Sequence, residues 1–342
     1  MNVSFSTRGW QQIPWEQQVQ MAETMRFGGV ELYNVHKTPE LTGRGGPLHR
    51  YTAAATAREL WQKGLCIPCF DTACDIAGED CTETVTALMQ LAHDVQCPYV
   101  SVTAQRDDDA RISAALEALL PAAEAQGITI LLKTSGVFSD TARLRALLDA
   151  FACDQLGALW DMHHPYRDHG ESADTTIKNL GAYVRHVHLR DSDDDGSYDL
   201  IGEGTLPVGS MMQALSSIDY DGFISLEWKP EWICAVKRVR SRFGRSLHPC
   251  ATSSSRCAAA MSASKTLFLR AAPFLAMGRP AGKAVSFPAA RSNCAPENGA
   301  MATYPFCCSS AWKASQASVS PWLMKTTSGL RSNASTQFSS PF

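Results

Sequence analysis

The chain has 342 residues, of which 45% are hydrophobic and 19% charged, so it can bury a core and is not a disordered polymer. It contains no apolar run of roughly 18 residues, and residues 1–15 lack a basic stretch followed by an apolar core. We therefore expect neither a membrane span nor a secretory signal, and we expect a cytoplasmic location.

The net charge of −3 conceals a sharp division of the chain near residue 235. Residues 236–342 contain 14 Lys and Arg but one acidic residue, whereas residues 1–235 contain 17 basic and 33 acidic residues. We therefore predict a folded domain over 1–235 and a separate basic, Ser-rich tail over 236–342. We expect the tail to be disordered or not native in sequence. The alternative is a basic arm that binds nucleic acid or anionic lipid.

Within residues 1–235, short apolar runs alternate with longer stretches of helical character. We expect strands at 2–6, 30–33, 65–70, 99–103, 128–132, 156–160, 184–189 and 223–228. We expect helices near 14–27, 53–63, 82–95, 110–126, 141–151, 173–180 and 210–217. This alternation predicts an α/β fold, a (β/α)8 TIM barrel. No clean amphipathic helix follows Trp232, so the last helix is expected to be incomplete or altered.

Two cysteines in the third predicted strand, Cys66 and Cys69, have CxxC spacing. A second such pair with zinc-finger spacing is missing from the sequence. Because free cysteine in a buried strand behaves as a small apolar residue, we favour packing over redox chemistry for this pair.

Ionisable residues gather at the ends of the predicted strands, where a TIM barrel has its active site. These are Glu31, Asp71, Lys133, Asp161, His163, His164, His186, His188, Arg190 and Glu227. Side chains alternate along a strand, so His186 and His188 share one face, and Glu227 lies opposite Leu226 and Trp228. Glu227 should therefore point into the barrel.

An inward carboxylate is costly unless a cation accompanies it. Asp161, His188 and Glu227 come from three consecutive strands, and this mixed ligand set suits Mn, Mg, Co or Zn. Simpler interpretations remain open, because His186 can equally serve packing or support a neighbouring ligand. Glu227 can also be the ion-pair partner of Arg190.

Four segments carry a resemblance to a known family: LGALWDMHHPYR (156–167), TIKNLGAYVRHVHLRDS (176–192), LIGEGTLPV (200–208) and FISLEW (223–228). Over about residues 1–232 the chain resembles the xylose isomerase-like barrels of the sugar phosphate isomerase/epimerase superfamily. The resemblance implies that Asp161, His188 and Glu227 bind a divalent metal and that Glu227 is also a catalytic base. It further implies that His164, Arg190 and Glu31 contact a sugar or sugar phosphate, and His186 beside them is another candidate substrate-binding residue.

The family pattern has a glutamate at the end of the fifth strand, where ILLKTSG (130–136) supplies Lys133. A protonated lysine cannot bind a metal and repels one. Three outcomes are open: the metal is held by three ligands and water, Lys133 replaces its charge in catalysis, or the barrel is inactive. A buried lysine can also form a Schiff base.

Three functions compete. The first is a sugar isomerase or epimerase that moves a proton next to a carbonyl, and the second is a catalytically impaired barrel. The third is a phosphodiesterase like an apurinic-site endonuclease. Such an enzyme needs a cluster of metals and several histidines at the early strand ends, where this sequence has only His36. The acidic barrel repels nucleic acid, so we do not expect that partner. Homo-oligomerisation is left open.

Overall fold

The structure is a computed structural model, and it describes residues 1–199, 201–227 and 229. The tail predicted over 236–342 and the helix expected after the eighth strand lie outside the described residues. The boundary proposed at residue 235 lies there as well, so it stays a prediction.

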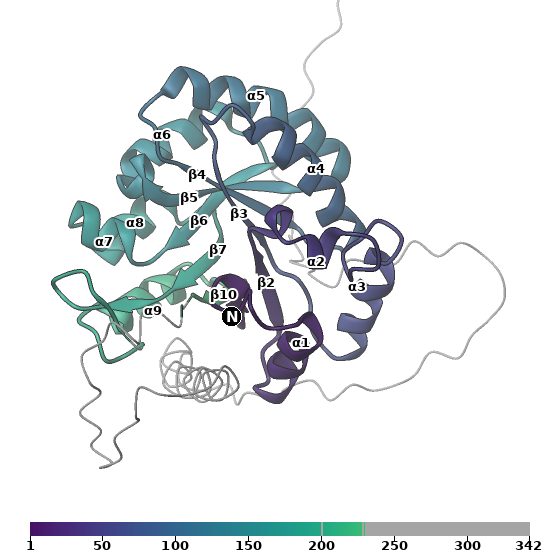
Figure 1. The fold of residues 1–342 in the computed structure, drawn as a ribbon. Coiled ribbons are helices and arrows are strands. Elements are labelled where there is room, and N and C mark those ends of the chain that lie inside the picture. The colour runs from purple at the N-terminus through teal and green to yellow at the C-terminus, as the bar shows by residue number, and fades with distance from the viewer. Residues whose placement is uncertain (200, 228, 230–342) are drawn as a thin grey trace, which may run out of the picture. The chain divides into compact units, whose positions relative to one another are not determined.

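Eight parallel strands close into a barrel in the order β1-β10-β7-β6-β5-β4-β3-β2, as Figure 1 shows end-on. The barrel strands are β1 (Asn2–Ser6), β2 (Gly29–Tyr33), β3 (Phe70–Asp75), β4 (Tyr99–Ala104), β5 (Thr129–Gly136), β6 (Leu156–Asp161), β7 (Val184–Leu189) and β10 (Phe223–Leu226). The barrel closes because the last strand, β10, pairs with the first, β1, as well as with β7. The predicted TIM barrel is confirmed.

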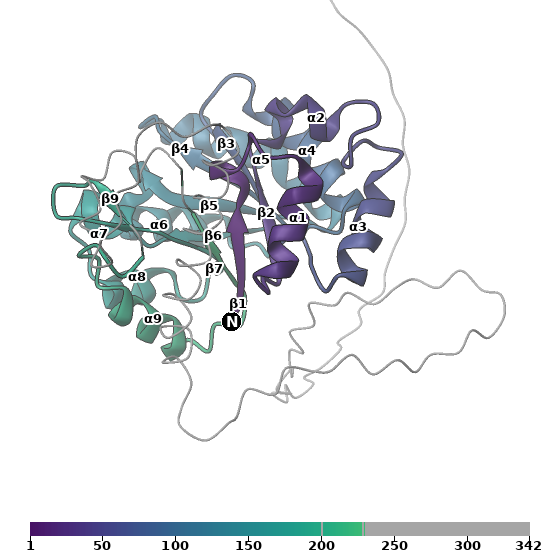
Figure 2. The ribbon, with the colours of Figure 1, turned by 60° about the horizontal axis from the view of Figure 1, so that its bottom comes forward.

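Helices follow the barrel strands and lie around the outside of the barrel (Figure 2). They are α1 (Trp15–Thr24), α2 (Pro39–Thr42), α3 (Ala53–Gln62), α4 (Cys81–Asp94), α5 (Asp109–Gln126), α6 (Thr141–Phe151), α7 (His164–His169), α8 (Ala173–Leu180) and α9 (Val208–Ser217). Three of these helices, α5, α6 and α8, begin with a side-chain cap; at the start of α6 the Asp140 side chain accepts hydrogen bonds from Ala142 N and Arg143 N. None of the helices described combines the length and apolar content that a bilayer span requires.

The two-residue strands β8 (Asp191–Ser192) and β9 (Tyr198–Asp199) form a small antiparallel sheet that the sequence did not predict. They belong to the loop after β7. This loop brings Tyr198 to the ends of β6 and β7, where its Oη accepts a hydrogen bond from Arg190 Nη1 at 3.4 Å and its ring lies 5.1 Å from the His163 ring.

The third strand was predicted too early, over 65–70, and the structure places it at Phe70–Asp75. Residues before Phe70 still run beside β2, since Cys66 O accepts a hydrogen bond from Val30 N at 2.9 Å. Pro68 lies in this segment and has no N–H, so a regular ladder of hydrogen bonds cannot pass through it.

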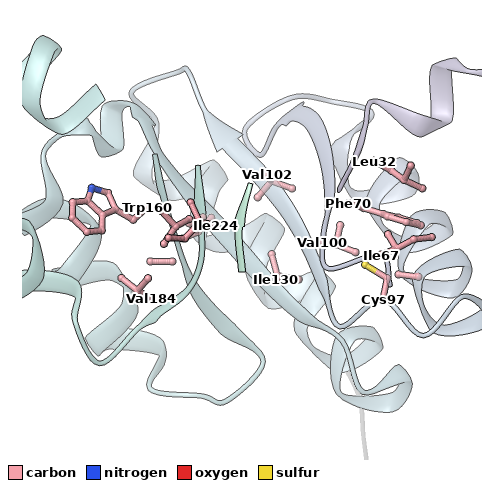
Figure 3. Close-up of a cluster of buried hydrophobic side chains, with 14 of the residues drawn as sticks. Leu32, Ile67, Phe70, Cys97, Val100, Val102, Ile130, Trp160, Val184 and Ile224 are labelled. Carbon is pink, nitrogen blue, oxygen red and sulfur yellow. The ribbon is translucent and has the colours of Figure 1, made fainter. Parts of the chain in front are cut away.

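The alternation along each strand produces two different surfaces. Residues such as Leu32, Val100, Ile130 and Trp160 join the main apolar core, part of which Figure 3 shows. Cys69, Leu131 and Leu159 form a separate small apolar cluster with Tyr99 packed against it. Because successive side chains on a strand point to opposite faces, this second cluster fills part of the barrel interior. The polar residues two positions further along the same strands therefore also point inward.

Candidate functional site

The candidate site is made by inward side chains at the carboxyl ends of the parallel strands. The register places both Asp161 of β6 and Ser225 of β10 beside His188 of β7. Glu227 follows β10 directly, and its N–H donates to Leu189 O at 3.0 Å. One ligand atom from each of Asp161, His188 and Glu227 lies within 4.8 Å of the other two. The structure thus brings together the three residues that the sequence suggested as a cluster.

The ammonium group of Lys133 lies between three carboxylates, from β3, from β6 and from the residue just after β10. Its Nζ atom is 3.4 Å from Asp71 Oδ2, 3.4 Å from Asp161 Oδ2 and 3.8 Å from Glu227 Oε1. Burial by itself would lower the pKa of Lys133, but the three carboxylates outweigh it and raise that pKa. Lys133 is therefore a charged ammonium here and not the neutral amine that Schiff-base formation requires.

The backbone of β5 explains how Lys133 reaches this position. Leu131 lies two residues earlier on the strand and points into the barrel, so Lys133 does the same one layer higher. The strand ends at Gly136, which has φ +61°, and a Cβ atom there would lie 2.2 Å from Ala104 O. Glycine is therefore required at the point where the chain leaves the barrel.

Arg190 binds two of the same carboxylates from the other side. Its Nη2 donates to Asp161 Oδ2 and its Nε to Asp161 Oδ1 at 3.3 Å, while its Nη1 lies 3.1 Å from Glu227 Oε2. The ion pair between Arg190 and Glu227, which the sequence left as an alternative, is thus present. Burial opposes the charge of Arg190, but Asp161 and Glu227 raise its pKa. Burial alone would raise the pKa of Glu227, yet Arg190, Lys133 and Arg8 hold it well below its usual value.

Arg8 also belongs to the site, although it was not among the residues predicted from the sequence. Its Nη1 donates to Glu227 Oε1, and its guanidinium lies 5.0 Å from the centre of the Tyr33 ring. Arg8 lies just beyond the end of β1, so its place at a strand end is a signal that could have identified it. We refer to the side chains in this ion-pair network as the charged cluster: Arg8, Asp71, Lys133, Asp161, Arg190 and Glu227.

Glu31 and His186 lie among barrel-interior side chains and contact His188. Glu31 Oε2 is 2.6 Å from His186 Nε2 and 2.8 Å from His188 Nε2, and His186 Nε2 is also 2.9 Å from Ser225 Oγ. Burial opposes the charge on Glu31, but the two histidines lower its pKa below the usual value. Burial also opposes protonation of His188, but Glu31 offsets this effect and the pKa of His188 is raised. Glu31 thereby positions the imidazole of His188, while its predicted contact with substrate stays a prediction.

His163 and His164 follow β6 and lie beside the charged cluster. His164 Nε2 accepts a hydrogen bond from Arg190 Nη2 at 2.7 Å, and its Nδ1 is 2.5 Å from Asp168 Oδ2. His163 is buried, and neither of its ring nitrogens has a hydrogen-bond partner among the described residues. Burial, together with the charge of Arg190, lowers the pKa of His163 to about 4, so its ring is neutral at pH 7.

The two cysteines of the CxxC pair are reduced and do not form a disulfide. Cys66 and Cys69 are both free thiols, and Cys69 belongs to the interior cluster with Leu131 and Leu159. Burial raises the pKa of Cys69 well above its usual value, so the reactive thiolate is disfavoured. This arrangement agrees with the packing role favoured by the sequence.

The candidate ligands are of types that bind divalent metals, but the positive charges next to them oppose such binding. Asp161, His188 and Glu227 supply two carboxylates and an imidazole, which is a common ligand set. Asp161 and Glu227, however, already share the ammonium of Lys133 and the guanidinium of Arg190. A metal beside these groups would face positive charges within a few ångströms in a buried site. Asp161, His188 and Glu227 as arranged therefore do not fit a bound divalent ion.

The sequence of the barrel matches a known protein family. A sequence profile described as xylose isomerase-like TIM barrel matches residues 19–242. A search of curated protein sequences finds no match.

The fold is shared, at low sequence identity, with solved structures that include the following three. D-psicose 3-epimerase in the presence of D-fructose is 13% identical with a TM-score of 0.60, over 80% of this chain and 99% of that chain. L-ribulose 3-epimerase is 14% identical with a TM-score of 0.60, over 81% and 95%. The IOLI protein with a binding zinc atom is 14% identical with a TM-score of 0.59, over 80% and 99%. With the profile match over most of the barrel, the chain belongs to the xylose isomerase-like TIM barrel family.

Proposed function

We propose that this protein is an isomerase- or epimerase-like enzyme that moves a proton at the carbon next to the carbonyl of a sugar or sugar phosphate. The family and the two epimerases of the same fold support this reaction class. The single observation that carries the proposal is a buried carboxylate, Glu227, that faces three cations at the carboxyl end of the barrel.

The proposed chemistry uses this pairing of opposite charges. Removal of a proton next to a carbonyl leaves negative charge on the carbonyl oxygen, as an enediolate. Fixed positive groups stabilise that charge most strongly where water is excluded. Lys133 and Arg190 are fixed in this way, because both are almost fully buried and held by carboxylates. No step in this proposal uses a metal.

Glu227 is the proposed base. Its low pKa means that it is ionised at neutral pH and has a lone pair to accept a proton. The same low pKa makes it a weak base while all three cations are in contact with it. Among these cations Arg8 has the most exposed side chain, at 21%, against 3% for Arg190 and 5% for Lys133. A substrate oxygen that draws Arg8 away would strengthen Glu227 as a base when the substrate binds.

The charged cluster favours isomerisation over epimerisation. Epimerisation at one carbon is served best by two bases on opposite faces, and Lys133 stands where the second carboxylate was expected. A single base suffices to take a proton from one carbon and return it to its neighbour on the same face. Arg190 and His164, which contact each other at the edge of the site, are the proposed ligands for substrate oxygens.

Hydrogen exchange tests the proposal directly. The full chain is incubated in D2O with a panel of aldoses, ketoses, their phosphates and hydroxypyruvate, and exchange of the C–H next to the carbonyl is followed by NMR. We expect exchange with at least one compound and its loss by about 100-fold or more in Glu227→Gln. Glu124→Gln on the exposed side of α5 is the matched control. Binding without exchange for every compound would favour the catalytically impaired barrel instead.

A further inference from the structure

We propose that the ammonium of Lys133 is the permanent cation of this barrel and takes the place of a divalent metal. Its use in catalysis rests on the proposed function, whereas the site itself is independent of that function. Lys133 supplies the positive charge that the neighbouring carbonyl and hydroxyl oxygens of a substrate meet. The protein therefore needs no metal for this purpose.

The position of Lys133 is the first support. A lysine that merely forms one ion pair needs one carboxylate, but Nζ lies within 3.8 Å of carboxylate oxygens from Asp71, Asp161 and Glu227. These come from β3, from β6 and from just after β10. The side chain of Lys133 is 5% exposed, so water does not replace these contacts. The ammonium is thus surrounded in the way that an oxygen-bound cation is.

The charge balance of the charged cluster is the second support. Its three carboxylates face three cations, so the cluster is neutral as it stands. A bound divalent ion would add two uncompensated positive charges in a buried volume, where unpaired charge is most costly. A change of Lys133 to glutamate would remove one positive charge and add one negative charge. That change supplies both the charge and the fourth ligand that a divalent ion requires.

The carboxylate oxygens themselves are the third support. Both oxygens of Asp161 contact Arg190, and its Oδ2 also contacts Lys133. Glu227 Oε1 contacts Arg8 and Lys133, and its Oε2 lies 3.1 Å from Arg190 Nη1. Every carboxylate oxygen of Asp161 and Glu227 therefore already has a cation next to it. A metal would have to displace Lys133, because Lys133 contacts both of these carboxylates and also Asp71.

Metal analysis of the full chain tests the proposal without any substrate. The native protein is dialysed against EDTA, exposed to Mn²⁺, Co²⁺ or Zn²⁺ at neutral pH, and analysed for tightly bound metal and for the thermal unfolding midpoint. We expect only trace metal and no change in midpoint for the native chain. We expect one equivalent of metal and a raised midpoint for Lys133→Glu, with a Co²⁺ visible spectrum that reports the ligands. Lys178→Glu on the exposed side of α8 controls for the change in charge.

Stoichiometric metal in the native chain, lost in Asp161→Asn, would overturn the proposal. The native measurement decides this even if Lys133→Glu fails to fold, and a failure of Lys133→Glu to bind metal while folded would count against it as well. If the exchange activity described above is found, it should survive EDTA dialysis and fall by about 100-fold in Lys133→Met. An absence of exchange with every compound would refute the proposed function but leave the metal result interpretable.

Discussion

Glu31 and His188 are 157 positions apart in the chain, yet Glu31 Oε2 lies 2.8 Å from His188 Nε2 in the barrel interior. Since Nε2 is engaged with Glu31, the Nδ1 atom of His188 is left to face Glu227, whose Oε2 is 3.9 Å away. Glu31 thus fixes the imidazole orientation next to the proposed base. Among the described residues, the hydrogen-bond partners of this fully buried carboxylate are His186 and His188, which stabilise its charge.

The change Glu31→Gln should therefore destabilise the protein. Removing one partner from a buried charged network leaves the remaining groups uncompensated, and we expect a loss of about 2–4 kcal/mol in the free energy of unfolding. Urea unfolding at pH 7 measures this loss. Glu40→Gln, at an exposed position on α2, is the matched control and should change the free energy by less than about 0.5 kcal/mol. Equal midpoints for both variants would contradict the structural role of Glu31.

Arg190 cannot be replaced by lysine without loss, although the charge is kept. Its guanidinium contacts both oxygens of Asp161 and also reaches Glu227 and His164. Lysine offers a single point of charge and cannot make these contacts together. We expect Arg190→Lys to lose about 2–3 kcal/mol of unfolding free energy, and to slow exchange by about 10-fold or more.

A surface arginine provides the comparison for Arg190. Arg145 forms an exposed pair with Asp149 one helical turn away, and such pairs contribute little. We expect Arg145→Lys to change the unfolding free energy by less than about 0.5 kcal/mol. If both arginines tolerate lysine equally, the charged cluster does not depend on guanidinium geometry.

His163 should make the protein sensitive to acid. Its pKa is about 4 in the folded state because of burial and Arg190, against about 6.5 in the unfolded chain. Between these values the unfolded chain binds a proton that the folded protein does not, so stability falls as the pH drops from about 6.5 towards 4. The loss should approach about 3 kcal/mol at the lower limit.

This effect is measured as a difference between proteins. Urea midpoints are compared at pH 7 and pH 4.5 for the native chain and for His163→Gln, and the variant should lose less stability on acidification. His169→Gln, at an exposed position at the end of α7, accounts for removal of a histidine from the surface. The same acid sensitivity in the native chain and in His163→Gln would refute the assignment.

The interior apolar cluster beneath the site should be intolerant of a cavity. Leu131 is fully buried with Cys69 and Leu159, so Leu131→Ala should cost about 2–5 kcal/mol of unfolding free energy. Trp61, which is 71% exposed on α3, should accept alanine at a cost below about 0.5 kcal/mol. Thermal or urea unfolding distinguishes the two. A small cost at Leu131 would mean that the barrel collapses readily around the space.

Much of the fold could be predicted because its pattern is local. Each strand is a short apolar run, and each helix begins and ends with recognisable residues, so the order of elements follows from neighbouring residues alone. The short helices α2 and α7 were not predicted. The third strand was misplaced, because apolar residues 65–70 have the pattern of a strand although Pro68 interrupts the hydrogen bonding. The sheet β8–β9 was missed because two-residue strands leave no periodic signal.

The site could be predicted only in part. Asp161, His188 and Glu227 were grouped because they end consecutive strands, and the closed barrel brings them together. Arg8 was missed although it follows the first strand, because a strand-end position alone does not show that it meets a residue more than two hundred positions later. The partners of Lys133 were also unknown, because Asp71 lies two strands away from β5 across the barrel interior.

The sequence by itself determined the alternation of strands and helices and the inward direction of polar residues at the strand ends. Its resemblance to the family also singled out Lys133, where that resemblance implies a glutamate. Only the tertiary structure decided how the charges are shared: three carboxylates on one ammonium, and two of them on Arg190 as well. The physical reason is that pairing energies depend on distance and burial, and both are set when β10 meets β1 and the barrel closes.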